Sequence, residues 1–279
     1  MDFVKLQATG NDFVLIDGRR MRHHDWSALA KAMCHRHFGV GADGILLILP
    51  SKKGDFYMRM FNPDGSEAEA CGNGLRCVAR YARDNGLAKG PEIKIETPAG
   101  MKTARIEGSK SIQVAIGKPV VTPAAIPVRV DKKGDPKTTP VIDYPVTIGK
   151  MKLKITCVSM GNPHVVCFLE QPVTDFPLTE VGPKVEHHPM FPNRVNFEIV
   201  NVISRSKLRA RVWERGAGET LSCGTGACAI AVAARLKKLA GNSVDIILPG
   251  GTLTVDWDDK GEVLLSGPAK VVFKGEWKG

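Results

Sequence analysis

The sequence predicts an α+β fold made of two similar halves, each a bent mixed or antiparallel sheet wrapped around one central helix. Two observations support this fold class. Most apolar segments are short and bounded by turn residues, and the same motifs occur twice, in the same order, 151 or 152 residues apart. The repeated pairs are Gly10–Phe13 with Gly161–His164, Phe61-Asn62 with Trp213-Glu214, Cys71–Gly74 with Cys223–Gly226, and Thr97–Gly100 with Leu248–Gly251. Ordered matches at one offset indicate an internal duplication.

The duplication suggests two domains, residues 1–117 and residues 118–267. Residues 118–150 are rich in proline and hold the crossover between the halves. We expect the C-terminal segment, 268–279, to return as a strand to the first domain. A chain of 279 residues is long enough to bury two cores of ordinary size.

Each half contains several predicted strands and one predicted main helix. Six segments have the length and apolar pattern of strands: 13–16, 45–49, 57–61, 165–168, 208–213 and 246–248. The first helix buries a face containing Leu75 and Val78, and we expect it to stop at Gly86. The second is expected to run from Ala227 to Leu239 and to stop at Gly241.

The net charge of +10 raises the question of a nucleic-acid partner. However, the basic residues are scattered, no tract reaches five like charges, and the chain has only 3 Tyr and 4 Trp for base stacking. We therefore expect no nucleic-acid partner, and a basic surface that attracts an anionic small-molecule substrate.

The cysteine count and the hydropathy together favour a cytoplasmic protein. Seven cysteines are an odd number, and the N-terminus lacks the pattern of a secretion signal, so a disulfide framework is not expected. No segment approaches the roughly 20 apolar residues that span a membrane. We expect free thiols in a reducing compartment and no membrane association.

Cys71 and Cys223 each stand directly before a Gly-x-Gly turn that opens into the main helix of their half. The first N–H groups of a helix attract anions such as carboxylates, and a helix N-terminus lowers a thiol pKa from about 8.5 toward neutrality. Glycines in the turn permit positive φ and close approach to a ligand. These glycines are Gly72, Gly74, Gly224 and Gly226. Each half thus offers a reactive thiol beside a carboxylate site.

If a pseudo-twofold axis relates the halves, both helix N-termini converge on one carboxylate, with one sulfur on each face of the attached carbon. One thiolate can then remove the α-proton while the opposite thiol returns a proton, and the helix termini stabilise the developing charge. We therefore predict inversion of a stereocentre next to a carboxylate, with Cys71 and Cys223 as the catalytic pair and no cofactor. Two close thiols titrate as a coupled pair, for which Glu214 and His164 are candidate tuning groups.

Other cysteine chemistries fit the sequence less well. The spacings Cys71 to Cys77 and Cys223 to Cys228 do not match structural zinc sites, and a Cys-x-x-Cys redox pair is absent. We expect no metal site. We interpret the remaining cysteines as small buried core residues. They are Cys34, Cys77, Cys157, Cys167 and Cys228.

Taken together, the motifs resemble the diaminopimelate epimerase family over essentially the whole chain. The segments that carry the resemblance are Gly10–Phe13, Phe61–Ser66, Cys71–Cys77, Met160–His164, Glu214–Thr220 and Cys223–Cys228. The resemblance implies a cofactor-independent isomerase that interconverts LL- and meso-2,6-diaminopimelate in lysine and peptidoglycan-precursor synthesis. It also implies a homodimer with an active site in the cleft between the two halves of each chain.

The resemblance assigns roles to particular residues. Cys71 and Cys223 match the catalytic pair, and His164 and Glu214 match positions that modulate the thiol pKa values. The α-carboxylate-binding turns correspond to Gly72-Asn73 and Gly224-Thr225. The other substrate-binding positions are Asn11, Asn62, Asn162, Asn196, Glu214 and Arg215. Amides and a guanidinium suit the distal amino-acid group of diaminopimelate.

One departure and two alternatives accompany this reading. Many family members carry glutamine where this chain has Gly44, the repeat partner of Asn196, so one amide contact is expected to be lost or replaced. A proline or hydroxyproline racemase shares the two-thiol logic but acts on a substrate with no distal amino-acid group. A basic nucleic-acid-binding module would have a salt-sensitive affinity for nucleic acid, and Cys→Ser changes would not alter that affinity.

Overall fold

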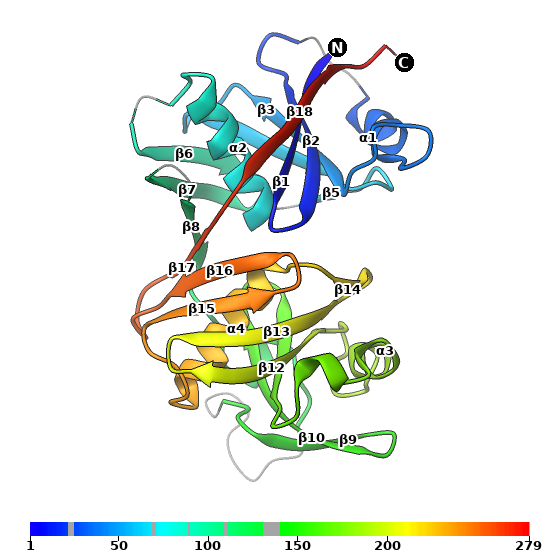
Figure 1. Ribbon diagram of the computed structural model, residues 1–279, viewed down its shortest axis with the longest axis vertical. Coiled ribbons are helices and arrows are strands. Elements are labelled where there is room, and N and C mark those ends of the chain that lie inside the picture. The colour runs from blue at the N-terminus through cyan, green and yellow to red at the C-terminus, as the bar shows by residue number, and fades with distance from the viewer. Residues whose placement is uncertain (22–24, 69–70, 89, 109–110, 131–139, 279) are drawn as a thin grey trace. The chain divides into compact units, whose positions relative to one another are not determined.

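The computed structural model describes residues 1–21, 25–68, 71–88, 90–108, 111–130 and 140–278 (Figure 1). The chain forms two compact units, Met1–Ala115 with Ser266–Gly279, and Ile116–Leu265. Each unit is a mixed sheet with one helix on its inner side and one on its outer side, which confirms the predicted α+β class. Part of the predicted crossover, residues 131–139, lies outside the described residues.

The first unit contains nine strands and two helices among the residues that the structure describes. The strands are β1 (Asp2–Ala8), β2 (Asn11–Asp17), β3 (Gly44–Leu49), β4 (Phe56–Phe61), β5 (Glu67–Ala68), β6 (Glu92–Thr97), β7 (Gly100–Glu107), β8 (Ser111–Gly117) and β18 (Lys270–Glu276). The helices are α1 (Trp26–Cys34) and α2 (Gly72–Asp84). Their spatial order is β18-β1-β2-β3-β4-β6-β7-β8, with β5 paired to β4.

The second unit repeats this composition with its own set of elements. Its strands are β9 (Tyr144–Ile148), β10 (Met151–Ser159), β11 (Pro163–Phe168), β12 (Asn196–Ser204), β13 (Lys207–Glu214), β14 (Gly218–Thr220), β15 (Ser243–Leu248), β16 (Gly251–Asp256) and β17 (Val263–Gly267). The helices are α3 (Leu178–Glu186) and α4 (Gly224–Leu236), with the 3₁₀ turns Pro123–Ala125 and Val173–Asp175. Their spatial order is β9-β10-β11-β12-β13-β15-β16, with β14 paired to β13.

The strand pairing is duplicated down to the register. From β1 to β7 the neighbours pair antiparallel, parallel, antiparallel, parallel and antiparallel, and β10 to β16 show the same series. Phe13 lies opposite Gly44 in the first unit, and His164 lies opposite Asn196 at the equivalent place in the second. The bidentate ion pairs Arg59–Glu67 and Arg211–Glu219 also occupy equivalent positions.

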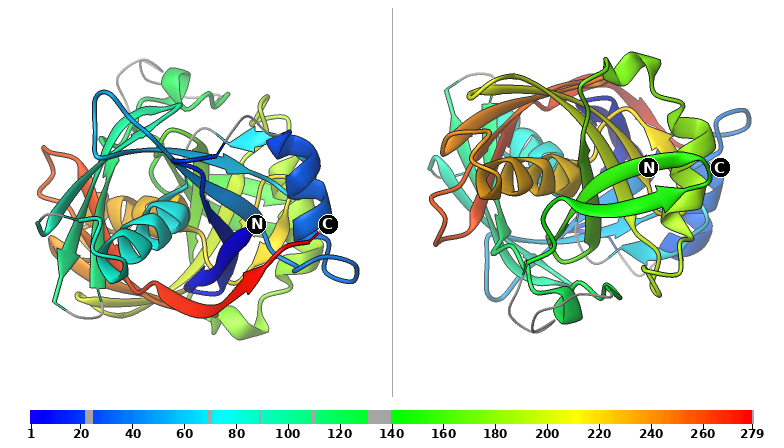
Figure 2. Two further views of the ribbon diagram at one scale, coloured as in Figure 1. Left: turned by 90° about the horizontal axis from the view of Figure 1, so that it is seen from above. Right: turned by 90° about the horizontal axis from the view of Figure 1, so that it is seen from below.

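Each sheet curves around its central helix (Figure 2). Helix α2 contacts β1, β2, β3, β4 and β7, and α4 contacts β10, β11, β12, β15 and β16. Helices α1 and α3 cover the outer face of their sheets, where they pack on two separate apolar clusters. The strands between the two helices are therefore buried on both faces, which explains why they appear in the sequence as continuous apolar runs.

Strand alternation decides which residues of these buried strands face the central helix. In β12, Phe197 and Ile199 pack in the cluster that contains α3, so Glu198 points to the opposite face, toward α4. In β11, Val165 and Cys167 belong to that same cluster, so His164 also faces α4. The carboxyl group of Glu198 and the imidazole of His164 therefore lie on the inner side of this sheet, which faces α4.

Both central helices end in the same backbone motif, but at one of them the residue differs from the prediction. After α2, Gly86 has φ +66°, and the N–H groups of Gly86 and Leu87 donate to the last free carbonyls, as expected. After α4, Lys238 takes this left-handed position with φ +60°. The predicted stop at Gly241 was therefore wrong, because the helix begins and ends three residues earlier than the sequence pattern indicated.

Over the part of the chain that the structure describes, no helix has the length and apolar character needed to cross a membrane.

Candidate active site

Cys71 and Cys223 are the N-cap residues of the two central helices. In each helix the third N–H donates to the capping sulfur at 3.4 Å: Gly74 to Cys71 and Gly226 to Cys223. The cap residues have extended backbones, so each thiol is held at the N-terminus of its helix. The structure places both predicted thiols in the same local geometry, where the first helical N–H groups are available to an anion.

Two of the motif glycines have a packing role that the sequence did not predict. All four lie within the first turns of α2 and α4, and none has the positive φ that the sequence analysis invoked. A Cβ on Gly74 would lie 2.9 Å from the side chain of Leu46, and one on Gly226 would lie 2.9 Å from Glu198 Oε1. Gly74 and Gly226 are therefore needed for the close approach of helix to strand.

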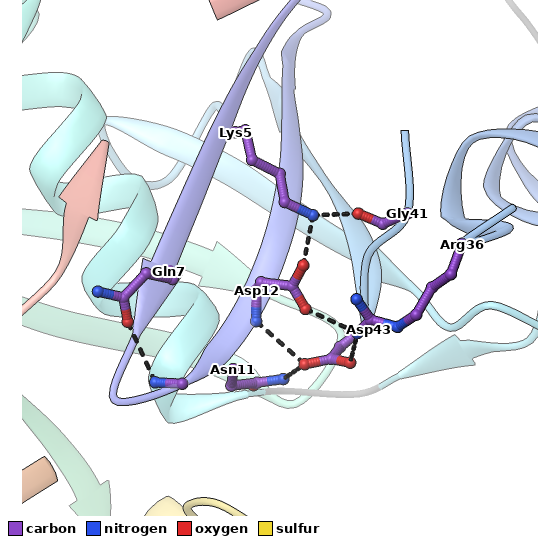
Figure 3. A network of polar contacts seen from close by, with 8 residues as sticks. Lys5, Gln7, Asn11, Asp12, Arg36, Gly41 and Asp43 are labelled. Atoms are coloured by element: carbon purple, nitrogen blue, oxygen red, sulfur yellow. Dashed lines mark hydrogen bonds and ion pairs between the residues drawn. The ribbon is translucent and has the colours of Figure 1, made fainter. Parts of the chain in front are cut away.

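In the first unit, the side chains near Cys71 form a chain of amides with a fixed direction. Arg76 donates to Asn73 Oδ1 at 2.7 Å, and Asn73 Nδ2 donates to Asn11 Oδ1 at 3.2 Å. Asn11 Nδ2 then donates to Asp43 Oδ2 at 2.7 Å (Figure 3). Arg76 is only a donor and an ionised Asp43 only an acceptor, so both ends specify the same orientation of the amides.

A charged network holds the acceptor end of this chain in place. Figure 3 shows Asp12 bonded to Lys5 and Arg36, while Arg36 also donates to Asp43 at 2.6 Å. Burial raises the pKa of Asp12, but the hydrogen bonds from Arg36 and Lys5 outweigh it, so that pKa lies below its ordinary value. The Asp43 carboxyl group also accepts from the Asp12 N–H at 3.0 Å, so it is held in place as the acceptor for Asn11.

In the second unit, a continuous chain of hydrogen bonds runs to Cys223. Glu198 Oε1 lies 2.7 Å from His164 Nδ1, and His164 Nε2 lies 3.0 Å from Asn162 Oδ1. Asn162 Nδ2 donates to Thr225 Oγ1 at 3.3 Å, and Thr225 Oγ1 lies 3.5 Å from Cys223 Sγ. Glu198 and His164 are both fully buried.

The surroundings of Cys223 disfavour its ionisation in the structure. Burial raises the pKa of the Cys223 thiol well above 9, the carboxylates of Glu214 and Glu198 raise it further, and hydrogen bonds from Thr225 and Gly226 only partly oppose them. The expectation of a lowered thiol pKa was therefore wrong for Cys223, because desolvation outweighs the helix terminus. The negative charge of Glu214 is the second cause of this raised pKa, after burial.

The other predicted binding residues differ in how accessible they are. Arg215 is exposed and donates from Nη1 to the Asn193 carbonyl at 3.0 Å. Asn196 is 3% exposed, and its amide holds the backbone of Pro163 and Arg215. Asn62 Nδ2 donates to Ser66 at 3.0 Å, within the turn that follows β4.

Glu214 lies at the end of β13, where it accepts from the Thr220 hydroxyl at 2.5 Å. Thr220 belongs to β14, so this bond ties together the strand and the segment that leads into α4. The carboxylate is thereby held on the Cys223 side of the second unit.

Sequence reasoning missed three residues that organise these groups: Arg76, Asp43 and Glu198. Two of them carry a sequence signal. Arg76 lies inside the Cys71–Cys77 motif, and Glu198 is the single acidic residue in the apolar run 197–200. A buried charge in an apolar segment requires a partner, and such a residue is a reasonable candidate for a site.

The five remaining cysteines are buried thiols, as expected. Burial raises the pKa of Cys34 and Cys167 to about 11 and that of Cys77 to about 12, so these thiols stay protonated at neutral pH. Within the described ranges, no three His, Cys, Asp or Glu side chains are grouped so that they could hold a metal ion.

Comparison with known proteins connects this geometry to a family. The family model described as diaminopimelate epimerase matches residues 3–122 and 156–272. The chain belongs to the diaminopimelate epimerase family. Among curated members, the diaminopimelate epimerases of Desulfovibrio desulfuricans and Moorella thermoacetica are each 47% identical, over 99% of this chain and 97% and 99% of their own lengths. These matches identify the chain as an epimerase, an isomerase, and confirm the resemblance.

Solved structures with the diaminopimelate epimerase-like fold include more distant proteins. A phenazine biosynthesis protein of the PhzF family from Bacillus anthracis superposes with a TM-score of 0.68 at 17% identity, covering 99% of this chain and 98% of that one. A probable proline racemase from Agrobacterium radiobacter gives 0.68 at 15% identity, covering 99% and 92%. At these identities the similarity establishes the fold alone, so the proline racemase alternative has much weaker support than the epimerase family.

Proposed function

We propose that this enzyme interconverts LL- and meso-2,6-diaminopimelate by a two-base mechanism that uses Cys71 and Cys223 and no cofactor. The observation that carries the proposal is the repeated cap geometry, in which each thiol accepts the third N–H of its helix at 3.4 Å. A reaction with mirror-related directions needs two groups of the same kind, and this chain presents such a pair in equivalent positions.

In each direction one thiolate removes the α-proton, and the other thiol delivers a proton to the opposite face of the same carbon. The free N–H groups at Gly72-Asn73 and Gly224-Thr225 bind the α-carboxylate and stabilise the charge that develops on it. Because the Cys223 pKa is raised, proton removal by Cys223 requires that its environment change when the anionic substrate enters.

The distal amino-acid group is bound by the amides and the exposed guanidinium. We assign Asn62, Glu214 and Arg215 to direct contact, since their side chains retain solvent access. Asn11 and Asn162 contribute their remaining hydrogen-bonding capacity, and Asn73 and the buried Asn196 position their neighbours. His164 acts on Cys223 through Asn162 and Thr225.

The cellular setting follows from the family. We propose that the enzyme acts in the cytoplasm, in lysine and peptidoglycan-precursor synthesis, as a homodimer and with the two halves 1–117 and 118–267 as its domains. Light scattering of the purified chain tests the oligomeric state, and a monomer at micromolar concentration would contradict it.

The deciding experiment is isotope exchange. Incubation with LL- or meso-diaminopimelate in heavy water should place deuterium on one α-carbon as the stereoisomers interconvert. Cys71→Ser and Cys223→Ser should each abolish turnover, whereas Cys167→Ala, which changes a buried thiol of β11, should leave it near that of the unmodified enzyme. Absence of exchange with folded, reduced protein would overturn the proposed function, and full activity in either serine variant would overturn the two-thiol mechanism.

A further inference from the structure

The hydrogen-bond chain of the second unit has a property that the amide chain of the first unit lacks. In the first unit the ends are Arg76, which can only donate, and Asp43, which can only accept. In the second unit the ends are the Glu198–His164 pair and Cys223, and both ends can gain or lose a proton. The direction of this second chain is therefore not determined by its ends.

In the observed orientation, every donor points toward the sulfur. His164 Nε2 faces Asn162 Oδ1, so Nε2 carries a proton, and Asn162 Nδ2 donates to Thr225 Oγ1. Because Thr225 Oγ1 already accepts that hydrogen bond, the hydroxyl proton is free to point to Cys223 Sγ, 3.5 Å away. One further proton is shared between Glu198 and His164 Nδ1. This arrangement suits a thiolate at Cys223.

The reverse orientation is equally complete. The Cys223 thiol donates to Thr225 Oγ1, the Thr225 hydroxyl donates to the Asn162 carbonyl oxygen after the amide turns over, and Asn162 Nδ2 donates to an unprotonated His164 Nε2. His164 Nδ1–H then donates to the Glu198 carboxylate. The two orientations contain the same number of protons, since the proton on Nε2 in one corresponds to the proton on Sγ in the other.

Equal proton number matters because this cluster is buried. Glu198 and His164 are fully buried, Cys223 is 5% exposed, and Glu198 Oε2 has no hydrogen-bond partner within the described residues. A change of net charge in such surroundings is far more costly than a shift of charge within the cluster. The charged groups that act on Cys223 are Glu214 on β13 and Glu198 on β12, and those that act on Glu198 are His164 and Glu214.

We propose that the hydrogen bonds of the chain Glu198–His164–Asn162–Thr225–Cys223 can reverse their donor-to-acceptor direction. This reversal couples the protonation of His164 to that of Cys223. Glu198 is the positioning residue that keeps the net charge of the cluster constant. For its consequence in turnover this inference rests on the proposed function, because Cys223 must lose and regain a proton in each cycle. Cys71 has a chain of fixed direction nearby, so the two thiols are controlled differently.

The coupling is tested by nitrogen-15 NMR of the His164 ring in the whole enzyme, with the signals assigned through His164→Gln. Replacing Cys223 by Ala should change the nitrogen-15 shifts of the His164 ring, because the chain loses the group that exchanges its proton with that ring. The same replacement in a Thr225→Val background should leave these shifts nearly unchanged, since valine keeps the shape but breaks the chain. Equal changes in both backgrounds would overturn the proposal, because they would reflect coupling through space alone.

Alkylation of Cys223 by iodoacetamide, followed by peptide mass spectrometry, gives a second readout that needs no substrate. Thr225→Val should slow the reaction at pH 8 by about tenfold, because the thiolate loses a charge-assisted hydrogen bond, and Thr225→Ser should restore the rate to within about twofold. Unchanged alkylation in Thr225→Val would also overturn the proposal.

The role of Glu198 is tested with an isosteric change and a matched control. In Glu198→Gln, His164 should be protonated less readily than in the unmodified enzyme, because an amide cannot balance an imidazolium. Glu186→Gln changes another buried carboxyl of the same unit, one that bonds Trp213 and Gly216, and should leave the His164 signals unchanged. Titration of His164 as in the unmodified enzyme would remove Glu198 from the chain. If the heavy-water exchange fails while these couplings are found, only the proposed function falls.

Discussion

The two thiols of this enzyme differ in burial and in the charged residues near them in the chain, since Cys71 is half-buried and Cys223 is buried. Helix α2 carries the buried guanidinium of Arg76 one turn after Cys71, whereas the equivalent position of α4 is the neutral Cys228. Cys223 instead faces the carboxylates of Glu198 and Glu214. A duplicated backbone has thus been given two different electrostatic environments, as expected for a pair in which one member is charged while the other is neutral.

Glu214 provides a test of these electrostatics. In Glu214→Gln the pKa of Cys223 should fall, since one of the negative charges that raise it is removed. Alkylation of Cys223 at pH 8 should therefore become about tenfold faster. Glu219→Gln, which removes a carboxylate paired with Arg211 on the neighbouring strand, is the control and should leave the rate unchanged. A slower reaction in Glu214→Gln would contradict the assignment.

Gly44 shows how one residue limits the substrate contacts available to this chain. A Cβ at this position would lie 2.7 Å from the Phe61 carbonyl oxygen, so a side chain cannot be added unless β3 and β4 shift. Asn196, at the equivalent position of the second unit, holds the Arg215 N–H. This chain therefore has no amide at position 44 that could match the role of Asn196 in the second unit.

Gly44→Ala should accordingly destabilise the protein by about 1–3 kcal/mol, the usual consequence of overpacking. Gly90→Ala is the control, because no atom lies within 4 Å of the added Cβ, and it should change stability by less than about 0.5 kcal/mol. Urea unfolding measures both. Equal stability of the two variants would show that β3 and β4 accommodate a side chain freely.

At the scale of elements, the helix-to-strand contact determines where each thiol lies. Gly74 and Gly226 allow the first turn of the helix to lie against Leu46 and Glu198, which are equivalent residues of β3 and β12. In the first unit the helix packs against the apolar side chain of Leu46, and in the second unit it packs against the carboxyl group of Glu198. The second unit therefore gains an ionisable group near its thiol without any change in backbone plan.

Substitutions at the C-terminal ends of the two central helices are expected to change the stability of the protein in opposite directions. Lys238 and Gly86 hold equivalent left-handed positions, with φ +60° and +66°. Lys238→Gly should stabilise the protein by about 1 kcal/mol, because glycine adopts this conformation without strain, and Gly86→Ala should destabilise it by a similar amount. Thermal or urea unfolding of the two variants checks both signs. A loss of stability in Lys238→Gly would contradict this account of the α4 terminus.

At the scale of the whole molecule, several buried or half-buried carboxylates are ionised in the folded chain. The pKa of Asp12 lies below 3.8 despite its burial because of Arg36 and Lys5, and hydrogen bonds from Arg19 lower that of Asp17. A carboxylate with a lowered folded-state pKa stabilises the fold above its unfolded pKa, and this contribution is lost as the pH falls through the folded value.

We therefore expect the free energy of unfolding to decrease as the pH falls below about 4. Asp12→Asn should be less stable than the unmodified chain at pH 7, and this difference should shrink at pH 3, where the contribution of Asp12 is diminishing. Urea titrations at the two pH values provide the measurement. A difference that stayed constant with pH would mean that the Asp12 charge does not contribute.

Much of the fold and part of the site could be predicted from the sequence. The strands, the two capped helices and the two N-cap thiols follow from local patterns, because turn residues, apolar periodicity and repeated motifs are contained in short segments. The outer helices α1 and α3 were not predicted, and the end of α4 was misplaced, because Lys238 carries no sequence mark of its left-handed conformation.

By itself, the sequence determined the duplicated plan, the α+β class and the pairing of Cys71 with Cys223 as equivalent residues, because a repeat preserves position and residue type. Only the tertiary structure decided that Cys223 lies among carboxylates that raise its pKa, and that Glu198, His164, Asn162 and Thr225 connect in one chain. These residues are up to 63 positions apart in the chain. Burial and hydrogen bonding between distant strands depend on packing, which no local pattern records.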